Sequence, residues 1–357
     1  MKVKIGLITF HSSINYGAML QAYAMQEYLL SCDYECVLID YVTKPHELEY
    51  LPDGKSKIPR KNSIRYQRFM KFMKNCMILT ENKYYTEKEL SENFPQCDIY
   101  MTGSDQVWNF NFREAVTPVY FLNLQQFKNR IAYGPSMGRC NPKKIDSYKE
   151  LLEKYEYIFP RENRTAQHLS NLLGKEFKPV VDPTLLLERE HWKKFVKPSK
   201  RRKPYLLYYI AENDEYSYEM AKKVAGALDG LEIIVLSYAK VYRGRNVYNC
   251  VNAGPIGFLN LVYNAEFVFT TSFHGTVFSI IYDVPFYTVL QHKDDSRIVN
   301  ILKEFGLQSR MLKKEGTMSL SKKILLERPG IEDGKLNQLT EGSKEMLHKA
   351  IDAVLKK

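Results

Sequence analysis

The chain has 357 residues, a formal net charge of +11 and an apolar content of 45%. That length is more than one hydrophobic core commonly holds, so we expect two domains, and the apolar content is ordinary for a globular protein. No run reaches the ~20 apolar residues of a membrane-spanning helix, and the first residues lack a secretory cleavage site, so we expect a cytoplasmic protein.

The cysteines and the charge narrow the class of protein further. The six cysteines are scattered and include no C-x-x-C pair, which argues against a metal site and a disulfide framework. The net positive charge favours anionic partners: nucleic acid, an anionic membrane surface or phosphorylated substrates. No RNP-type or helix-turn-helix signature is present, so we expect no nucleic acid.

The chain begins with the β-loop-α-β order of a doubly wound α/β fold. Residues 3–9 are predicted as a strand and residues 11–17 as the loop after it. Apolar residues at helical spacing predict a helix over residues 18–30, and residues 36–41 are the next strand.

A basic stretch follows at residues 55–74, where lysines and arginines interleave with aliphatic and aromatic residues. A basic amphipathic helix can lie on an anionic membrane, so this segment is a candidate for peripheral membrane contact. The alternative is a surface helix that packs on its own domain.

Several short strands then each lead into a polar or glycine-containing loop, as expected for strands that share one sheet edge. They are residues 98–102 before Ser104 and Asp105, residues 130–133 before a glycine-containing turn, residues 157–159 before Arg161, and residues 180–181 before an Asp-Pro-Thr turn.

A second α/β unit starts at residues 205–210, after a charged stretch at residues 192–203 that we predict to be the linker. We therefore predict an α/β protein of two Rossmann-like domains that face a cleft. The N-terminal domain spans residues 1–195 and the C-terminal domain residues 204–335. A last helix, residues 336–357, can pack back on the first domain.

The stretch FVFTTSFHGTVFSIIYDVPF, residues 267–286, is the most informative part of the chain. It reads as a strand, a tight turn, a short helix and a second strand. His274 and Gly275 then lie at a helix N-terminus beyond the carboxyl end of a parallel strand. Free N–H groups and the positive end of the helix dipole make such a place suitable for an anion.

The motifs NYGAMLQAYAMQEYL, TGSDQVWN, IAYGPSMG, PRE, VVDPTLLL and TTSFHGTVFSIIYDVPF follow one another in the order and approximate spacing of the polysaccharide pyruvyl transferase family, which the chain resembles over most of residues 1–306. The resemblance implies a glycosyltransferase-B-like fold. It also implies transfer of the enolpyruvyl unit of phosphoenolpyruvate onto a glycan or an undecaprenyl-diphosphate-linked sugar. The basic segment 55–74 would help the protein meet such a lipid-linked sugar at the inner face of the plasma membrane. Phosphoenolpyruvate is then a co-substrate, and no cofactor or metal is expected.

This chemistry needs an acid, a base and clamps for two anionic groups, and guanidinium groups suit carboxylates and phosphates best. His274 is the first candidate for a catalytic role, and Asp105 is a candidate base for the sugar hydroxyl. Both can also be read as helix or turn caps. The donor-binding candidates, which include His274 itself, are Arg161, Ser272, His274, Gly275 and Arg297.

The acceptor side is predicted from the loops of the first domain. Glycine in the first strand-to-helix loop permits close approach to a ligand. Trp108 can stack on a sugar face, although aromatic residues of this kind more often lie in the core. The acceptor-binding candidates are Asn15, Tyr16, Gly17, Ser104, Asp105 and Trp108.

One departure from the family pattern affects the donor. Many relatives carry an arginine two residues before the histidine, where this chain has Ser272, so Arg297 or Arg161 must supply that cation or the donor is different. Two alternatives therefore stay open: a glycosyltransferase that uses a nucleotide sugar on the same fold, and a non-catalytic protein that binds a sugar or an anion.

Overall fold

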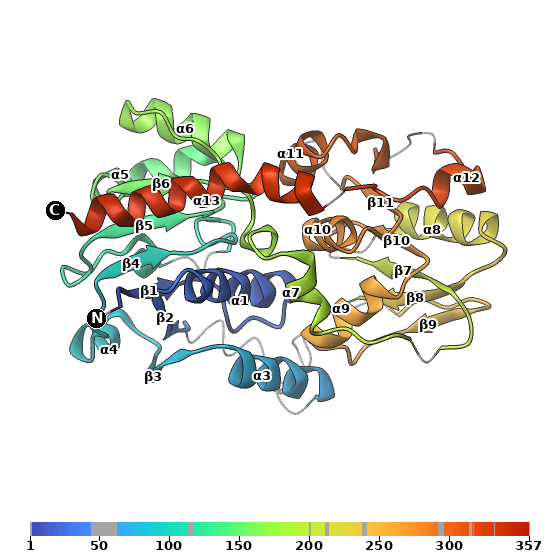
Figure 1. The fold of residues 1–357 in the computed structure, drawn as a ribbon, viewed down its shortest axis with the longest axis horizontal. Helices are drawn as coiled ribbons and strands as arrows, with labels where there is room; N and C mark the ends of the chain where they lie inside the picture. The colour runs from blue at the N-terminus through green and yellow to red at the C-terminus, as the bar shows by residue number, and fades with distance from the viewer. Residues whose placement is uncertain are drawn as a thin grey trace. The chain divides into compact units, whose positions relative to one another are not determined.

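The computed structural model describes residues 2–43, 63–112, 117–199, 201–210, 214–237, 241–291, 296–313, 316, 318–331 and 333–356. The chain divides into two compact units (Figure 1). Unit 1 comprises Met1–Leu51, Met70–Leu187 and Asn337–Lys357, and unit 2 comprises Pro52–Phe69 and Glu188–Leu336.

Unit 1 contains a six-stranded parallel sheet in the order β3-β2-β1-β4-β5-β6. Its strands are β1 (Lys4–Ile8), β2 (Glu35–Tyr41), β3 (Leu79–Tyr84), β4 (Ile99–Thr102), β5 (Arg130–Tyr133) and β6 (Tyr157–Phe159). Its helices are α1 (Tyr16–Ser31), α4 (Glu87–Glu92), α5 (Lys149–Leu152) and α6 (Asn163–Leu173), with 3-10 turns η1 (Pro118–Phe121), η2 (Pro142–Tyr148) and η3 (Pro183–Leu185).

Unit 2 repeats this topology with the order β12-β11-β10-β7-β8-β9, again all parallel. Its strands are β7 (Tyr205–Tyr209), β8 (Glu232–Leu236), β9 (Val247–Asn249), β10 (Phe267–Thr270), β11 (Phe286–Val289) and β12 (Met311–Leu312). Its helices are α7 (Arg189–Lys193), α8 (Glu215–Ala227), α9 (Pro255–Tyr263), α10 (Phe273–Ile281), α11 (Ser296–Glu304) and α12 (Lys322–Leu325), with the turn η4 (Gln308–Arg310).

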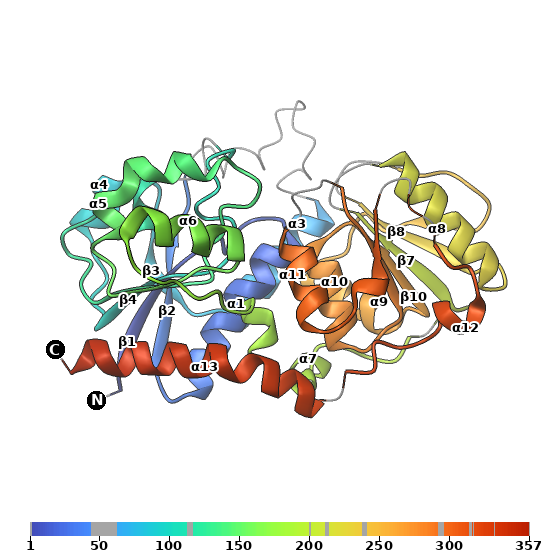
Figure 2. The ribbon, with the colours of Figure 1, turned by 90° about the horizontal axis from the view of Figure 1, so that it is seen from above.

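Helices cover both faces of the second sheet. Successive side chains of β7 point to opposite faces, and those on each face contact a different helix. Tyr208 lies in a core cluster with Tyr218 of α8, whereas the ring of Tyr209 lies 5.1 Å from that of Phe258 of α9. Phe258 in turn contacts Phe278 of α10, and Figure 2 shows α8 on one side of this sheet and α9 and α10 on the other. The predicted doubly wound architecture is therefore confirmed in unit 2.

Each sheet reverses its strand order at its central pair, β1 and β4 in unit 1 and β7 and β10 in unit 2. The register pairs Ile8 with Thr102 and Tyr209 with Thr270, so the carboxyl ends of each central pair lie side by side. Open α/β sheets bind their ligands outside the carboxyl ends of the strands at this switch point. The fold thus marks one candidate position in each unit.

The helix α3 (Ile64–Cys76) contains the described part of the predicted membrane-contact segment. Its Phe69 and Phe72 are buried, and Arg65 is also buried and donates from Nη1 to the carbonyl of Ser237 at 3.3 Å. These aromatic side chains pack on the chain itself, which is the alternative to membrane contact. Residues 55–62 lie outside the described residues.

No helix among the described residues is long and apolar enough to cross a membrane.

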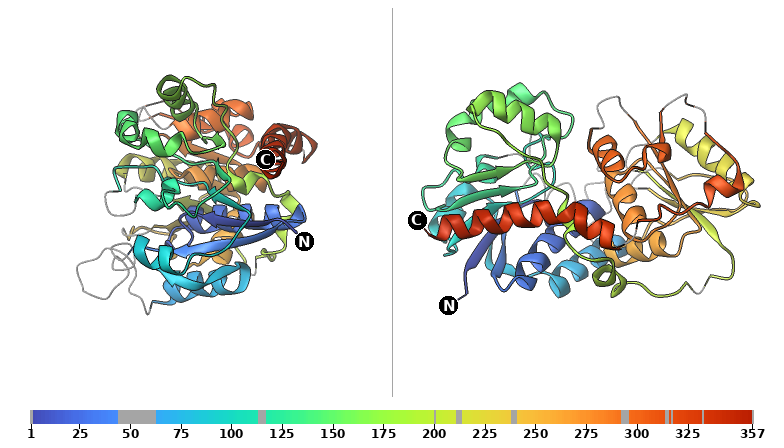
Figure 3. Two further views of the ribbon diagram at one scale, coloured as in Figure 1. Left: turned by 90° about the vertical axis from the view of Figure 1, so that its left-hand side faces the viewer. Right: turned by 45° about the horizontal axis from the view of Figure 1, so that its top comes forward.

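The last helix, α13 (Asp333–Leu355), runs along unit 1 (Figure 3). His348 accepts or donates a hydrogen bond with Tyr28 of α1 at 2.9 Å, and the hydroxyl of Ser343 accepts from the N–H of Val181 at 3.1 Å. Leu347 and Ile351 are fully buried. The residues of this helix from Asn337 onward are therefore part of the core of unit 1.

We expect Leu347→Ala to lower the free energy of unfolding by about 2–5 kcal/mol, because it leaves a cavity where α13 packs. Glu345→Ala, on the exposed side of the same helix, should change it by less than about 0.5 kcal/mol. Chemical denaturation of both variants checks this. Equal unfolding midpoints for the two would mean that α13 is not part of the core.

Candidate active site

The two switch points carry the residues that the sequence analysis singles out. Asp105 lies three residues beyond Thr102, the end of β4, and His274 lies four residues beyond Thr270, the end of β10. Asp105 therefore lies in the loop just beyond a central strand of its sheet, and His274 lies in the first turn of the helix that follows the corresponding strand of the other sheet. We describe the two places separately, starting with unit 2.

Hydrogen bonds fix the turn that places His274. The hydroxyl of Thr270 donates to the carbonyl of Tyr209 at 2.7 Å and accepts from the N–H of Ser272 at 3.0 Å. Ser272 is the N-cap of α10, and its hydroxyl accepts from the N–H of Gly275 at 3.4 Å. His274 thus lies in the first turn of α10, at the positive end of the helix dipole.

The structure brings Arg297 close to the residue beside His274. The guanidinium of Arg297 lies 5.7 Å from the ring centroid of Phe273, within cation–π range. The ring of Phe273 in turn contacts the imidazole of His274 edge to face, with centroids 5.1 Å apart. His274 is 6% exposed. An imidazole, a serine hydroxyl, a guanidinium and a helix N-terminus therefore gather at the carboxyl end of β10.

Gly275 is needed for packing. A Cβ at this position would lie well inside contact distance of the Thr270 hydroxyl and 2.9 Å from the ring of Tyr209. α10 can therefore approach β7 and β10 only because residue 275 has no side chain. The N–H of Gly275 donates to the hydroxyl of Ser272. The predicted contact of Gly275 with phosphoenolpyruvate stays a prediction.

In unit 1, the loop after β1 leads into α1. Asn15 is the N-cap of α1, and its side-chain oxygen accepts from the N–H groups of Gly17 at 2.9 Å and Ala18 at 3.2 Å. Asn15 is exposed, whereas Tyr16 and Gly17 are buried. Of these three acceptor candidates, Asn15 is the one whose side chain is accessible on its unit.

The loop after β4 holds Asp105 in an unusual backbone conformation. The φ angle of Asp105 is 73°, in the left-handed region that few residues other than glycine adopt. The N–H of Ser136 donates to its carbonyl at 2.9 Å, and the carbonyl of the preceding Ser104 accepts from the hydroxyl of Thr9 at 2.6 Å. Neighbouring loops therefore fix this conformation.

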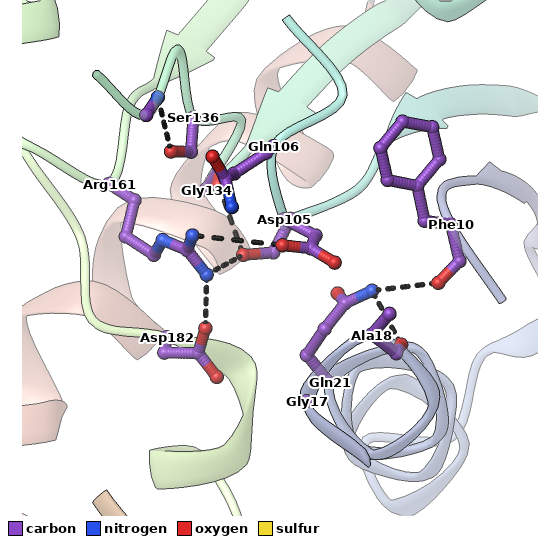
Figure 4. A network of polar contacts seen from close by, with 12 residues as sticks. Phe10, Gly17, Ala18, Gln21, Asp105, Gln106, Gly134, Ser136, Arg161 and Asp182 are labelled. Atoms are coloured by element: carbon purple, nitrogen blue, oxygen red, sulfur yellow. Dashed lines mark hydrogen bonds and ion pairs between the residues drawn. The ribbon is translucent and has the colours of Figure 1, made fainter. Parts of the chain in front are cut away.

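Arg161, in the loop after β6, is buried among carboxylates (Figure 4). Its Nη1 lies 2.6 Å from Asp182 Oδ2, its Nε lies 3.8 Å from Glu162 Oε1, and its Nη2 lies 3.9 Å from Asp105 Oδ1. Burial by itself lowers the pKa of Arg161, but the charges of Asp182, Glu162 and Asp105 outweigh it and raise the pKa above its usual value. Arg161 is therefore a permanent cation.

Trp108 lies in the core of unit 1. It is 0% exposed, its ring stacks on that of Phe121 at 5.1 Å, and its Nε1 donates to the carbonyl of Tyr120 at 3.1 Å. This position argues against the predicted stacking of Trp108 on a sugar, because both ring faces and the N–H belong to the interior. The sequence around a tryptophan does not distinguish a ring that stacks on a sugar from a ring that packs in the core.

The sequence analysis missed several polar residues around Asp105. The sequence predicts Asp182 only as part of a turn and gives no role to Glu162, yet both are buried against Arg161. Gln21, fully buried in α1, donates to Thr9 Oγ1 at 3.1 Å and to the carbonyl of Ala18 at 2.9 Å. The signal in the sequence that could have identified Gln21 is a polar residue among the apolar residues that form the buried face of the helix.

Comparisons with known proteins identify the family of the chain. The model of the polysaccharide pyruvyl transferase family matches residues 15–293, a range that contains both Asp105 and His274. The chain belongs to the polysaccharide pyruvyl transferase family. It is accordingly a transferase, and the family implies a pyruvyl donor and a polysaccharide acceptor in general terms. A search of curated proteins found no match.

Solved structures show the same fold at low sequence identity. A UDP-GlcNAc 2-epimerase from Methanocaldococcus jannaschii is similar with a TM-score of 0.54 at 14% identity, over 98% of this chain and 100% of that one. The epimerase from Rickettsia bellii gives 0.55 at 11% identity, over 99% and 97%. The glycosyltransferase of kitacinnamycin gives 0.50 at 13% identity, over 98% and 99%. The glycosyltransferase-B-like fold is thereby confirmed.

Among the described residues, no group of three or more His, Cys, Asp or Glu side chains is placed to hold a metal ion.

We expect Gly275→Ala to lower the free energy of unfolding by about 1–3 kcal/mol, because the new methyl group has no space between α10 and the sheet. Gly226→Ala is the matched control, since nothing lies within 4 Å of a Cβ at that position of α8. The control should be neutral or stabilising by up to about 1 kcal/mol. Thermal unfolding distinguishes the two, and an equally stable Gly275→Ala variant would contradict the close packing.

Proposed function

We propose that this transferase moves the pyruvyl group of phosphoenolpyruvate onto a sugar of a surface polysaccharide or of its undecaprenyl-diphosphate-linked precursor, forming a pyruvate ketal and releasing phosphate. One observation carries the proposal. His274 lies in the first turn of α10 at the switch point of unit 2, with the guanidinium of Arg297 stacked over the adjacent Phe273. Family membership supports the pyruvyl donor and the glycan acceptor.

The atoms balance without an oxidant or a metal. The methylene carbon of phosphoenolpyruvate takes one proton, which leaves an oxocarbenium-like centre at its central carbon. One sugar hydroxyl attacks that carbon and loses its proton, the bond to the phosphate oxygen breaks, and a second hydroxyl attacks in turn. The two hydroxyl protons end on the new methyl group and on phosphate. The enzyme therefore needs a proton donor, a proton acceptor and groups that bind two anions.

Unit 2 offers the groups that suit the donor. The N-terminus of α10 and the hydroxyl of Ser272 favour an oxyanion, and Arg297 supplies a cation that Ser272 lacks. His274 can hold the phosphate or give it a proton as it leaves. With Gly275 these residues form the proposed donor set of this unit.

Unit 1 offers a base. Asp105 is 9% exposed, and its carboxylate lies in the first loop beyond β4. We assign to it the removal of the proton from a sugar hydroxyl. Ser104 and the loop of Asn15, Tyr16 and Gly17 are the proposed acceptor contacts. An undecaprenyl-linked acceptor is held in the plasma membrane, so we place the reaction at the inner face of that membrane.

Incubation with phosphoenolpyruvate and a panel of lipid-linked sugars tests the proposal, with phosphate release and a product mass that includes the ketal as readouts. A thermal-shift comparison of phosphoenolpyruvate with nucleotide sugars runs beside it. Stabilisation by a nucleotide sugar alone would favour a glycosyltransferase, and stabilisation by phosphoenolpyruvate without turnover of any acceptor would favour a non-catalytic binding protein.

We expect His274→Ala to abolish phosphate release while the melting temperature changes little. The reason is that the imidazole takes part in the proposed reaction and contributes little to the stability of the fold. His168→Ala is the control, since His168 of α6 is a partly exposed histidine of the other unit that pairs with Asp146 at 2.7 Å. The control should keep full activity. A large loss of stability in His274→Ala would instead assign the histidine a capping role.

Arg297→Ala should raise the KM for phosphoenolpyruvate about 10-fold to 100-fold, the loss expected for a charge-assisted contact with an anion. Arg328→Ala is the control in the same unit, because Arg328 is exposed and donates to the carbonyl of Asp283 at 2.9 Å. Steady-state kinetics check both variants. An unchanged KM in Arg297→Ala would remove Arg297 from the donor site.

A further inference from the structure

We propose that Arg161 is a positioning residue for Asp105, and that Asp182 is the anchor that holds Arg161 in place. This role replaces the donor contact expected for Arg161 from the sequence. The inference rests on the proposed function, in which Asp105 removes the proton from a sugar hydroxyl, and it names the residues that make this carboxylate competent.

The charges around Arg161 are unfavourable for an anionic donor. Asp182, Glu162 and Asp105 all lie within 4 Å of its guanidinium, so the cluster carries three carboxylates and one cation. All four residues are at most 9% exposed, and interactions between charges are screened little in such surroundings. A phosphate or a carboxylate that approached this guanidinium would meet an excess of negative charge.

Two of the three carboxylates are already held by other groups. The oxygens of Glu162 accept hydrogen bonds from the hydroxyls of Ser136 and Thr165. Asp182 Oδ1 accepts from the N–H of Thr184 at 3.0 Å and from its hydroxyl at 2.7 Å. Asp182 is therefore a rigid partner, and its bond to Nη1 at 2.6 Å fixes the plane of the guanidinium.

Asp105 differs from the other two. Its Oδ1 lies 3.9 Å from Nη2 of Arg161, which is within ion-pair range but beyond hydrogen-bond distance. Arg161 can thus hold the charge of Asp105 without occupying its lone pairs, so the carboxylate can accept the proton of a hydroxyl. Figure 4 shows the guanidinium between Asp182 and Asp105, with the link to each drawn.

The backbone of Asp105 supports the same role. A left-handed φ of 73° costs free energy for an aspartate, and such strain persists where the surroundings impose it. Arg161 takes part in this restraint, since its Nη1 also donates to Ser104 Oγ at 3.4 Å and its N–H donates to the carbonyl of Pro135 at 3.3 Å. Arg161 therefore contacts both the residue before Asp105 and the loop that bridges to it.

The test compares Asp182→Asn and Arg161→Lys with wild type, using phosphate release for kcat and the KM for phosphoenolpyruvate. Misplacing a catalytic base commonly costs about 10-fold to 100-fold in rate. We expect kcat to fall by that factor while the KM for phosphoenolpyruvate stays within about two-fold. A rise in this KM of ten-fold or more with kcat kept would assign Arg161 to the donor and overturn the proposal.

Two further measurements keep this test independent of folding and of the proposed activity. Arg130→Lys is the matched control, because Arg130 is another buried arginine of unit 1 and donates to the carbonyls of Phe127 and Leu124. This control should lower stability without the selective loss of kcat expected for the two test variants.

If wild type releases no phosphate with any acceptor, the proposed function fails. Crystal structures of Asp182→Asn and Arg161→Lys then test the positioning role by itself. An Asp105 carboxylate that leaves its wild-type position supports the positioning role, and one that stays overturns it.

Discussion

At the carboxyl ends of β1 and β4, and again of β7 and β10, the chain turns outward from the centre of a parallel sheet. The strand order reverses between these central strands, and open α/β sheets bind their ligands outside the strand ends at such a point. Asp105 in unit 1 and His274 in unit 2 occupy the same topological place. The chemistry assigned to each residue depends on this repeated constraint more than on any single contact.

The two places differ in charge. The turn at His274 combines a helix N-terminus, a hydroxyl and a nearby guanidinium, and so suits an anion. The turn at Asp105 combines a carboxylate with an arginine that two further carboxylates neutralise. A neutral polyol that gives up a proton suits the second place better than phosphoenolpyruvate does. This contrast is consistent with a donor side and an acceptor side in the two units.

Much of the fold could be predicted from sequence because parallel strands buried on both faces read as short apolar runs. The same runs located His274, because the strand, the turn and the helix that place it follow one another directly along the chain. The surroundings of Arg161 could not be predicted, because Asp182 and Asp105 lie 21 and 56 positions away along the chain and only tertiary structure brings them together. Trp192 shows the same limit. It opens a charged stretch predicted to be a linker, yet it is fully buried against Phe278.

Unit 1 is discontinuous, and this has a consequence for biosynthesis. Residues 337–357 complete its core, but the ribosome makes them only after every residue of unit 2. Unit 2 can thus reach its native state while unit 1 still exposes the apolar surface that α13 later covers. Nascent chains would carry this uncovered apolar surface until residues 337–357 are made, which makes them clients for chaperones that recognise such surfaces.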